Sequence, residues 1–137
     1  MKSMIKKSFP ELEKRKIFLF EFNLKKYHGG SIKLPFFDIV VISTNLKNKI
    51  KIQGVLAHEL CHLERFKKKG WLKYAFEGAF YWIIPSFRIN EDRNTDKSAI
   101  EKGYARNLYS LKKNKKKNKY YLSAEEIKEY ARKIGKW

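Results

Sequence analysis

Alternating apolar and polar residues near the N-terminus predict a small β-sheet. In residues 17–24, three phenylalanines and a leucine alternate with Glu21 and Asn23, as in a half-buried strand whose phenylalanines face the core. The turn residues 28–30 follow, then a short extended piece and the run 36–44, which is rich in β-branched and aromatic residues. The pattern predicts a meander of two or three strands.

The rest of the chain has apolar residues at the three- and four-residue spacing of helices. One pattern begins after the N-cap candidates Ser43, Thr44 and Asn45 and stops at Gly70. Further helices are predicted at 89–102, ending at Gly103, and at 104–111. A last helix begins at a capping box, 123–126. Its apolar side carries Ile127, Tyr130, Ala131 and Ile134.

This order of elements, on 137 residues, predicts a single α+β domain spanning 1–137, with a short antiparallel or mixed sheet packed on helices. Within it, residues 112–119 form a basic connector and residues 121–137 a C-terminal helix.

The most apolar stretch is 71–87. Its longest uncharged part, 78–87, is far shorter than the roughly 20 residues that span a bilayer, so we do not expect it to cross a membrane. The favoured interpretation is a helix that packs apolar residues into the core. These residues are Leu72, Phe76, Ala79, Phe80 and Ile83. An interfacial membrane contact or a homodimer surface is the alternative.

The formal charge is +18, from 32 Lys and Arg against 14 Asp and Glu. Such a charge suits nucleic acid or an acidic membrane surface. The dense run at 112–119 is typical of a solvated connector, and no zinc ribbon or RNA-binding motif accompanies it. The single cysteine, Cys61, and the lack of an apolar segment after the basic N-terminus predict a cytoplasmic protein, peripheral at a membrane in the alternative.

Candidate chemistry is concentrated in the sequence HELCH, residues 58–62. His58 and His62 are four residues apart on a predicted helix, so both imidazoles can reach one Zn²⁺ ion. Glu59 points to the side, where it can hold a zinc-bound water as general base. Zinc lowers the pKa of that water to about 7, and the reaction predicted is amide hydrolysis. Cys61 is interpreted as a packing residue of the helix.

The third ligand has to be found elsewhere. No histidine follows His62, so a carboxylate is expected, and the best candidates lie on the predicted helix within residues 90–104. Asp92 and Asp96 are four residues apart there, on one face. One can bind zinc while the other holds a ligand histidine through its second ring nitrogen.

These motifs resemble the gluzincin clan of zinc metallopeptidases, and most closely the minigluzincins, whose pattern is HExxH followed by ExxxD. The similarity covers most of the chain, from "FPEL" through the strands, "GVLAHELCHL" and "DRNTDKSAIEKGY" to "LSAEEIKEYARKIG". The resemblance implies a zincin-like endopeptidase domain with His58 and His62 as zinc ligands and Glu59 as the general base.

The second motif departs from the family pattern. The ligand position holds Asp92 where the family has Glu, while Glu91 lies one residue earlier. Asp92 is favoured as third ligand and Glu91 is the alternative. The resemblance assigns Asp96 the role of holding a ligand histidine.

The resemblance also implies how substrate binds. In gluzincins the strand before the active helix pairs with an extended polypeptide substrate, and here that strand would be 36–44. Minigluzincins are latent through a C-terminal segment, so residues 121–137 are predicted either to plug the cleft or to dock on the domain's own core. A tyrosine is expected as transition-state donor. The candidates are Tyr104, Tyr109, Tyr120 and Tyr121.

Three other functions are kept as alternatives. An HtpX-like membrane-associated peptidase would use 71–87 as its membrane segment. A basic nucleic-acid-binding protein would bind through the lysine run at 112–119. A non-catalytic zinc protein would bind the metal ion without hydrolysing a substrate.

Overall fold

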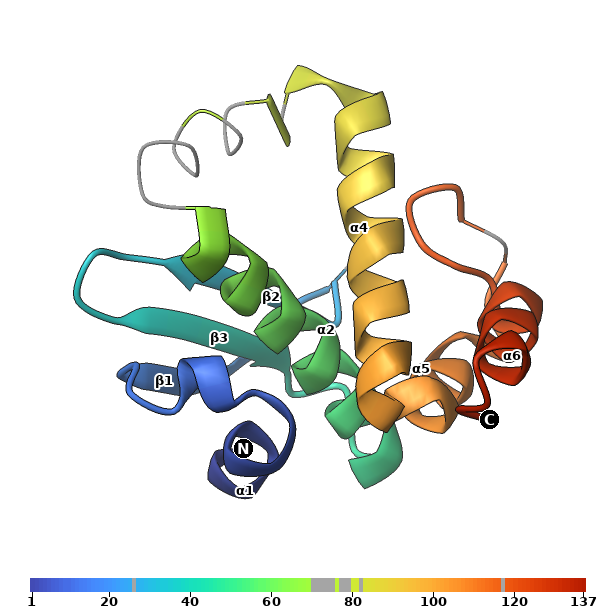
Figure 1. The fold of residues 1–137 in the computed structure, drawn as a ribbon, viewed down its shortest axis with the longest axis horizontal. Coiled ribbons are helices and arrows are strands. Elements are labelled where there is room, and N and C mark those ends of the chain that lie inside the picture. The colour runs from blue at the N-terminus through green and yellow to red at the C-terminus, as the bar shows by residue number, and fades with distance from the viewer. Residues whose placement is uncertain (26, 70–75, 77–79, 82, 117) are drawn as a thin grey trace.

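A three-stranded mixed sheet forms one side of the molecule, and helices cover one of its faces (Figure 1). The computed structural model describes residues 1–25, 27–69, 76, 80, 81, 83–116 and 118–137. The strands are β1 (Ile17–Phe22), β2 (Gly29–Lys33) and β3 (Asp38–Ser43). The helices are α1 (Lys2–Ser8), the 3₁₀ turn η1 (Pro10–Leu12), α2 (Lys49–Lys69), α4 (Pro85–Ala99), the π-helical turn η2 (Ile100–Tyr104), α5 (Ala105–Lys112) and α6 (Ala124–Lys133). The predicted α+β class is confirmed.

The strand order differs from the predicted meander. β3 lies in the centre, parallel to β1 and antiparallel to β2, so the order is β1-β3-β2. β3 is the most buried of the three strands, whereas β2 is short and contains two glycines. The central place therefore goes to the strand whose residues can be buried on both sides, and β2 becomes an edge strand.

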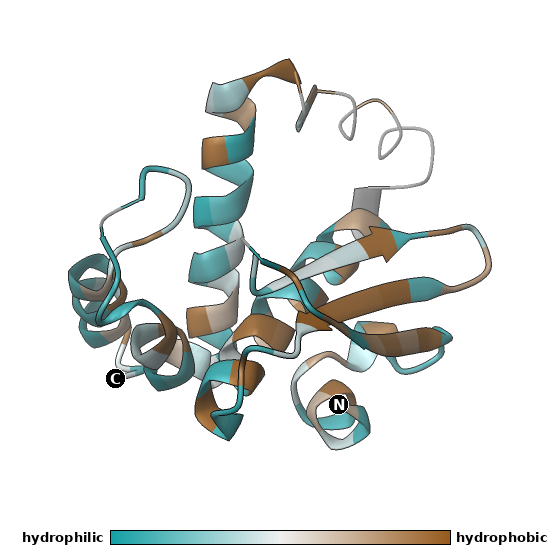
Figure 2. Cartoon of the chain, turned by 180° about the vertical axis from the view of Figure 1, so that it is seen from behind, coloured by the Kyte–Doolittle hydropathy of each residue, from teal (hydrophilic) through white to brown (hydrophobic). Residues whose placement is uncertain are grey.

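The phenylalanines of β1 do not face the core as predicted. The register aligns Phe18 and Phe20 with Ile39 and Val41 of β3, on the face opposite to buried Val40. Phe18, Phe20 and Phe22 are exposed and pack against one another along the strand. Strands β1 and β3 are predominantly apolar in colour in Figure 2. Residues 18–22 are all exposed, so the prediction of a half-buried strand is wrong. Periodicity alone cannot tell whether a helix will cover either face of an edge strand.

The core lies between the sheet and α2 and continues between α2 and the C-terminal helices. Val40 and Ile42 of β3 and Leu56 and Leu60 of α2 belong to one cluster with residues of α5 and α6. Cys61 is buried in the same cluster, and burial raises the pKa of its thiol to about 12. It is a packing residue, as predicted.

Helix α4 begins earlier and ends earlier than the predicted span 89–102. Pro85 stands at its first turn, where a missing N–H costs nothing, and regular α-helix stops at Ala99. The π-helical turn η2 follows, in which Gly103 has a φ of 92°, and α5 starts beyond it. The predicted stop at Gly103 is therefore a change of direction between α4 and α5.

Helix α6 has the predicted capping box. The Ser123 hydroxyl accepts from the backbone N–H of Glu126, and the Glu126 carboxylate accepts from the backbone N–H of Ser123. Ala124, Ile127 and Ala131 are buried, the last two within the core cluster. α6 thus takes the second of its two predicted placements, docked on the domain's own core, and α4 stands between it and the sheet in Figure 1.

The predicted core helix at 71–87 is wrong for the members of its apolar set that are described. Phe76, Phe80 and Ile83 are 69%, 46% and 74% exposed. Leu72 and Ala79 lie outside the described residues. Among the helices of the described residues, none combines the length and the apolar character that a membrane span requires.

Candidate metal centre

The middle of α2 brings three functional side chains to one place. His58, Glu59 and His62 lie where α2 passes beneath the sheet, and each residue is only 8% exposed. The helical turn between the two histidines sets their Nε2 atoms 3.2 Å apart, with the rings edge to face. The sequence predicted this pairing from spacing alone.

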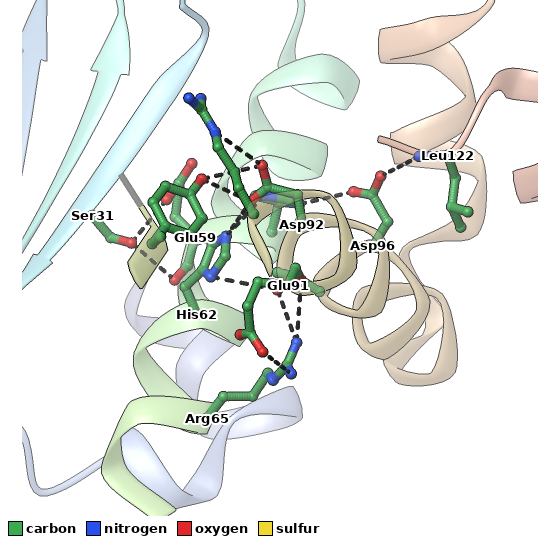
Figure 3. Close-up of polar contacts among 12 residues, drawn as sticks. Ser31, Glu59, His62, Arg65, Glu91, Asp92, Asp96 and Leu122 are labelled. Carbon is green, nitrogen blue, oxygen red and sulfur yellow. Dashed lines mark hydrogen bonds and ion pairs between the residues drawn. The ribbon is translucent and has the colours of Figure 1, made fainter. Parts of the chain in front are cut away.

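Helix α4 supplies the carboxylates. Asp92 is buried, and its Oδ1 lies 3.4 Å from His62 Nε2. One ligand atom from each of His58, His62 and Asp92 lies within 4.8 Å of the other two, so these three buried residues could hold a metal ion. In Figure 3, Asp92 points toward His62, and Asp96, one turn later, is joined to Leu122.

Asp96 fixes the orientation of His58. Its Oδ1 lies 2.8 Å from His58 Nδ1, and its Oδ2 accepts the backbone N–H of Leu122 at 3.0 Å. Burial alone would raise the pKa of Asp96, but the hydrogen bond and charge interaction with His58 outweigh it and lower that pKa. An ionised Asp96 requires the proton on His58 Nδ1, which leaves the Nε2 lone pair directed into the site.

Thr95 orients the ring of His62 as Asp96 orients that of His58. The Thr95 hydroxyl donates to the backbone carbonyl of Glu91 at 2.7 Å, so its oxygen is an acceptor toward His62 Nδ1, 3.4 Å away. Arg65 Nη1 donates to the same oxygen at 3.2 Å. With the Nδ1 proton directed at Thr95, the Nε2 lone pair of His62 also points into the site.

Two of the distances among these ligand atoms are compatible with a tetrahedral metal ion such as zinc. Two atoms bound to tetrahedral zinc at about 2.0–2.1 Å lie about 3.4 Å from each other. The Nε2 to Nε2 distance of 3.2 Å and the Nε2 to Oδ1 distance of 3.4 Å are close to this value. Two imidazoles and one carboxylate are also a donor set that catalytic zinc sites use.

Glu91 is directed elsewhere. Its Oε1 forms an ion pair with Arg65 Nη2 at 3.0 Å, and Arg65 Nη1 also donates to the Glu91 backbone carbonyl (Figure 3). Of the two adjacent acidic residues, the structure brings Asp92 to the histidines and holds Glu91 on Arg65. One helical step of about 100° separates their side chains, so they face different neighbours.

Glu59 is positioned from the sheet. Its Oε2 accepts a hydrogen bond of 2.8 Å from the Ser31 hydroxyl on β2. Two residues along β2, on the same face of the sheet, Gly29 pairs with Ile42 and lies so close to α2 that a Cβ on Gly29 would lie 2.4 Å from Val55 Cγ1. Glycine at position 29 therefore allows the contact between strand and helix that orients the carboxylate of Glu59.

Two contacts of Asp92, with Tyr81 and Arg88, were not found from the sequence. The Tyr81 hydroxyl donates to both oxygens of Asp92, at 2.9 and 3.1 Å, and burial beside Asp92 raises its pKa, so the hydroxyl stays protonated. Arg88 Nε lies 3.8 Å from Asp92 Oδ2. The four-residue spacing of Arg88 and Asp92 was a usable signal. Nothing in the sequence indicated Tyr81.

The predicted tyrosines separate clearly. Tyr104 bonds to Ser8 through its hydroxyl, and Tyr109 packs on Trp137, both away from the histidines. Tyr120 and Tyr121 line the cleft, and the ring of Tyr121 packs edge to face on His58 with centroids 5.7 Å apart. Tyr121 is therefore the candidate that contacts the centre.

The cleft has two parts that meet at His58, Glu59 and Tyr121. A basic part of about 600 Å³ is lined by lysines of the segment 112–116. An apolar part of about 420 Å³ is lined by side chains that include Leu24, Ile32, Phe66 and Phe87.

The prediction that the strand at 36–44 pairs with the substrate is wrong. It corresponds to β3, whose two edges are occupied by β1 and β2. Among the strands, the cleft is lined mainly by β2, one of the two edge strands, with Val41 of β3 beside it. The pattern of apolar residues does not show that β3, and not β2, occupies the centre of the sheet.

In comparisons with known proteins, no family model, curated protein or solved structure matched this chain.

Proposed function

We propose that this protein is a zinc metallopeptidase that hydrolyses peptide bonds of extended polypeptides. The observation that carries the proposal is the convergence of His58 Nε2, His62 Nε2 and a carboxylate oxygen of Asp92 in a buried site beside Glu59. His58, His62 and Asp92 would hold the ion, and Asp96 and Thr95 would orient the two imidazoles. Asp92 is preferred over Glu91 because Glu91 is paired with Arg65.

A zinc ion bound here would supply Lewis-acid chemistry to the scissile carbonyl and lower the pKa of a water molecule. Glu59 would take the proton from the attacking water and return it to the leaving amine, which is the role of a general base and then a general acid. Ser31 holds one carboxylate oxygen of Glu59 and thereby fixes the direction of the other. Tyr121, in contact with His58, is the proposed donor to the developing oxyanion.

The edge strand β2 would hold the substrate. In the antiparallel pair β2–β3, Ser43 N–H donates to the His28 carbonyl and Leu34 N–H donates to the Phe37 carbonyl. Alternation along the strand then turns the backbone groups of Gly29 and Ser31 away from β3. These groups can pair with an extended polypeptide, which is recognition by main chain.

The decisive experiment combines metal content with peptide cleavage. The wild type should bind one zinc ion per chain and cleave casein or a quenched peptide. Glu59→Gln should keep zinc and lose at least about 100-fold in kcat, because the base is removed and the ligands are not. Glu129→Gln, an exposed glutamate on α6, is the control and should leave both unchanged. Purified protein without zinc affinity, or an active Glu59→Gln variant, would refute the proposal.

A peptidase at a membrane surface is the second candidate. The exposed Phe76, Phe80 and Ile83 lie between α2 and α4, where HtpX-like enzymes carry membrane segments. Partition of the protein into anionic vesicles, lost in Phe76→Ser/Ile83→Ser, would support this candidate. Wild type that stays free of vesicles would leave the first candidate, at the predicted cytoplasmic location.

A further inference from the structure

Lysines of the basic connector 112–119 lie at the cleft. Four of them, Lys112, Lys113, Lys115 and Lys116, line the same pocket as His58 and Glu59. Lys112 is half-buried and lies over the Tyr121 ring, 3.7 Å from its centroid. The connector predicted to be merely solvated is therefore one wall of the cleft beside the proposed reaction centre.

The carboxylates of this pocket do not balance the lysines. Glu59, Asp96 and Glu125 also line it. Asp96 is already bonded through both oxygens, to His58 and to the Leu122 N–H, and Glu59 is bonded to Ser31. A concave wall with an excess of one charge concentrates ligands of the opposite charge.

The other part of the cleft is chemically different. Ile32, Phe66 and Phe87 line the apolar part, which shares His58 and Glu59 with the basic part but contains none of its lysines. β2 passes both parts, because His28 and Gly29 line the basic part and the residues from Gly29 to Ile32 line the apolar part. A strand laid along β2 would thus place residues on either side of one peptide bond in two unlike environments.

We propose that the basic wall is a subsite for acidic side chains, so that the protein cleaves polypeptides in which aspartate or glutamate flanks the scissile bond and a large apolar residue lies on the other side of it. This specificity rests on the proposed peptidase function. If the substrate pairs antiparallel with β2, the more stable arrangement, its C-terminal part lies beside the lysines.

The test uses three quenched peptides with a leucine before the scissile bond. The residues after that bond are Glu in the first peptide, Gln in the second and Lys in the third. The zinc-loaded wild type should cleave the Glu peptide about 10-fold faster in kcat/KM than the Gln peptide at low salt, and the Lys peptide more slowly still. Raising the salt from about 0.05 to about 0.5 M should shrink the preference, because it shortens the range of exposed charges.

A matched pair of variants separates the subsite from the overall charge. Lys115→Glu/Lys116→Glu removes exposed lysines of the cleft, and Lys6→Glu/Lys7→Glu removes exposed lysines of α1 with the same change in net charge. The first should lose the preference for Glu over Gln, measured as the ratio of the two kcat/KM values, or reverse it toward Lys, while its zinc content stays at wild-type level. The second should keep the preference.

The outcomes are distinguishable from failure of the proposed function. A zinc-loaded wild type that cleaves no peptide refutes both. Cleavage of Glu and Gln peptides at equal rates, or equal effects of the two double variants, refutes the acidic subsite alone. Lysine-dependent binding of a single-stranded oligonucleotide without an acidic preference in cleavage would likewise overturn it and assign these lysines to nucleic acid.

Discussion

The Nε2 atoms of His58 and His62 lie 3.2 Å apart. The Nδ1 atoms of the two rings are hydrogen-bonded to Asp96 and Thr95, respectively. Two lone pairs at this distance repel each other unless a proton or a metal ion lies between them. Asp96 and Thr95 thus hold the histidines in an arrangement that could bind a metal ion. The first prediction concerns which carboxylate completes that pair.

Replacement of Asp92 by Asn should lower zinc affinity by more than about 100-fold, which exceeds the usual cost of losing a partner outside the ligand set. Glu91→Gln should bind zinc as the wild type does, because Glu91 is paired with Arg65 and not directed at the histidines. Zinc titration against a competing chelator measures both. The reverse ranking of the two variants would assign the ligand to Glu91.

Removal of the Tyr121 hydroxyl tests its proposed role. Tyr121→Phe keeps a ring that can pack on His58. It should lower kcat about 100-fold or more, as the loss of an oxyanion donor does, with KM and zinc affinity little changed. Tyr109→Phe, in contact with Trp137, is the control. A Tyr121→Phe variant with wild-type kcat would exclude the tyrosine as donor.

The close approach of β2 to α2 predicts a difference between adjacent glycines. Ala at position 29 would place Cβ 2.4 Å from Val55 Cγ1 and 2.9 Å from the Val41 carbonyl oxygen, whereas at Gly30 no atom lies within 4 Å. Gly29→Ala should therefore lower the free energy of unfolding by about 1–3 kcal/mol, the usual cost of overpacking. Gly30→Ala should not destabilise the protein. Urea denaturation compares the two, and equal effects would contradict the close packing.

The capping box of α6 predicts a pH dependence of stability. The hydrogen bond from Arg93 and those at the helix N-terminus lower the pKa of Glu126 to about 2, although burial opposes them. Because the pKa is lower in the folded state, Glu126 stabilises the fold above its ordinary pKa of 4.5, and this stabilisation is lost as the pH falls toward 2.

Glu126→Gln should therefore be less stable than wild type at pH 6 by about 1 kcal/mol, a value reduced because the pair with Arg93 is partly exposed and screened. The difference should disappear near pH 2. Glu125→Gln, on the exposed side of the same turn, is the control. Chemical denaturation across this pH range gives the comparison, and a difference that does not change with pH would mean that charge is not the cause.

The sequence was most informative where function depends on local spacing. The turn between His58 and His62, the turn between Asp92 and Asp96, and the capping box at Ser123 each lie within one helix, so the 3.6-residue period places their side chains. Asp92 and Glu91 could not be separated in this way, because the choice depends on Arg65, which comes from a different helix.

Contacts between distant segments were also beyond the sequence. The bond of Ser31 to Glu59 follows from the exchange of β2 and β3 in the sheet, and the placement of Tyr81 on Asp92 depends on how the chain returns from α2 to α4. The exposure of Phe18, Phe20 and Phe22 has the same origin, since periodicity defines two faces of a strand and tertiary packing selects one.

The contact between His58 and Asp96 spans 38 positions of the chain and joins α2 to α4. An ion held by His58, His62 and Asp92 would act as a cross-link between the same two helices. Because the three ligands come together only in the folded chain, the binding free energy of the ion would add to that of folding. Chelation would then do more than stop hydrolysis. It would remove the metal link between α2 and α4 and make the unfolded chain more accessible.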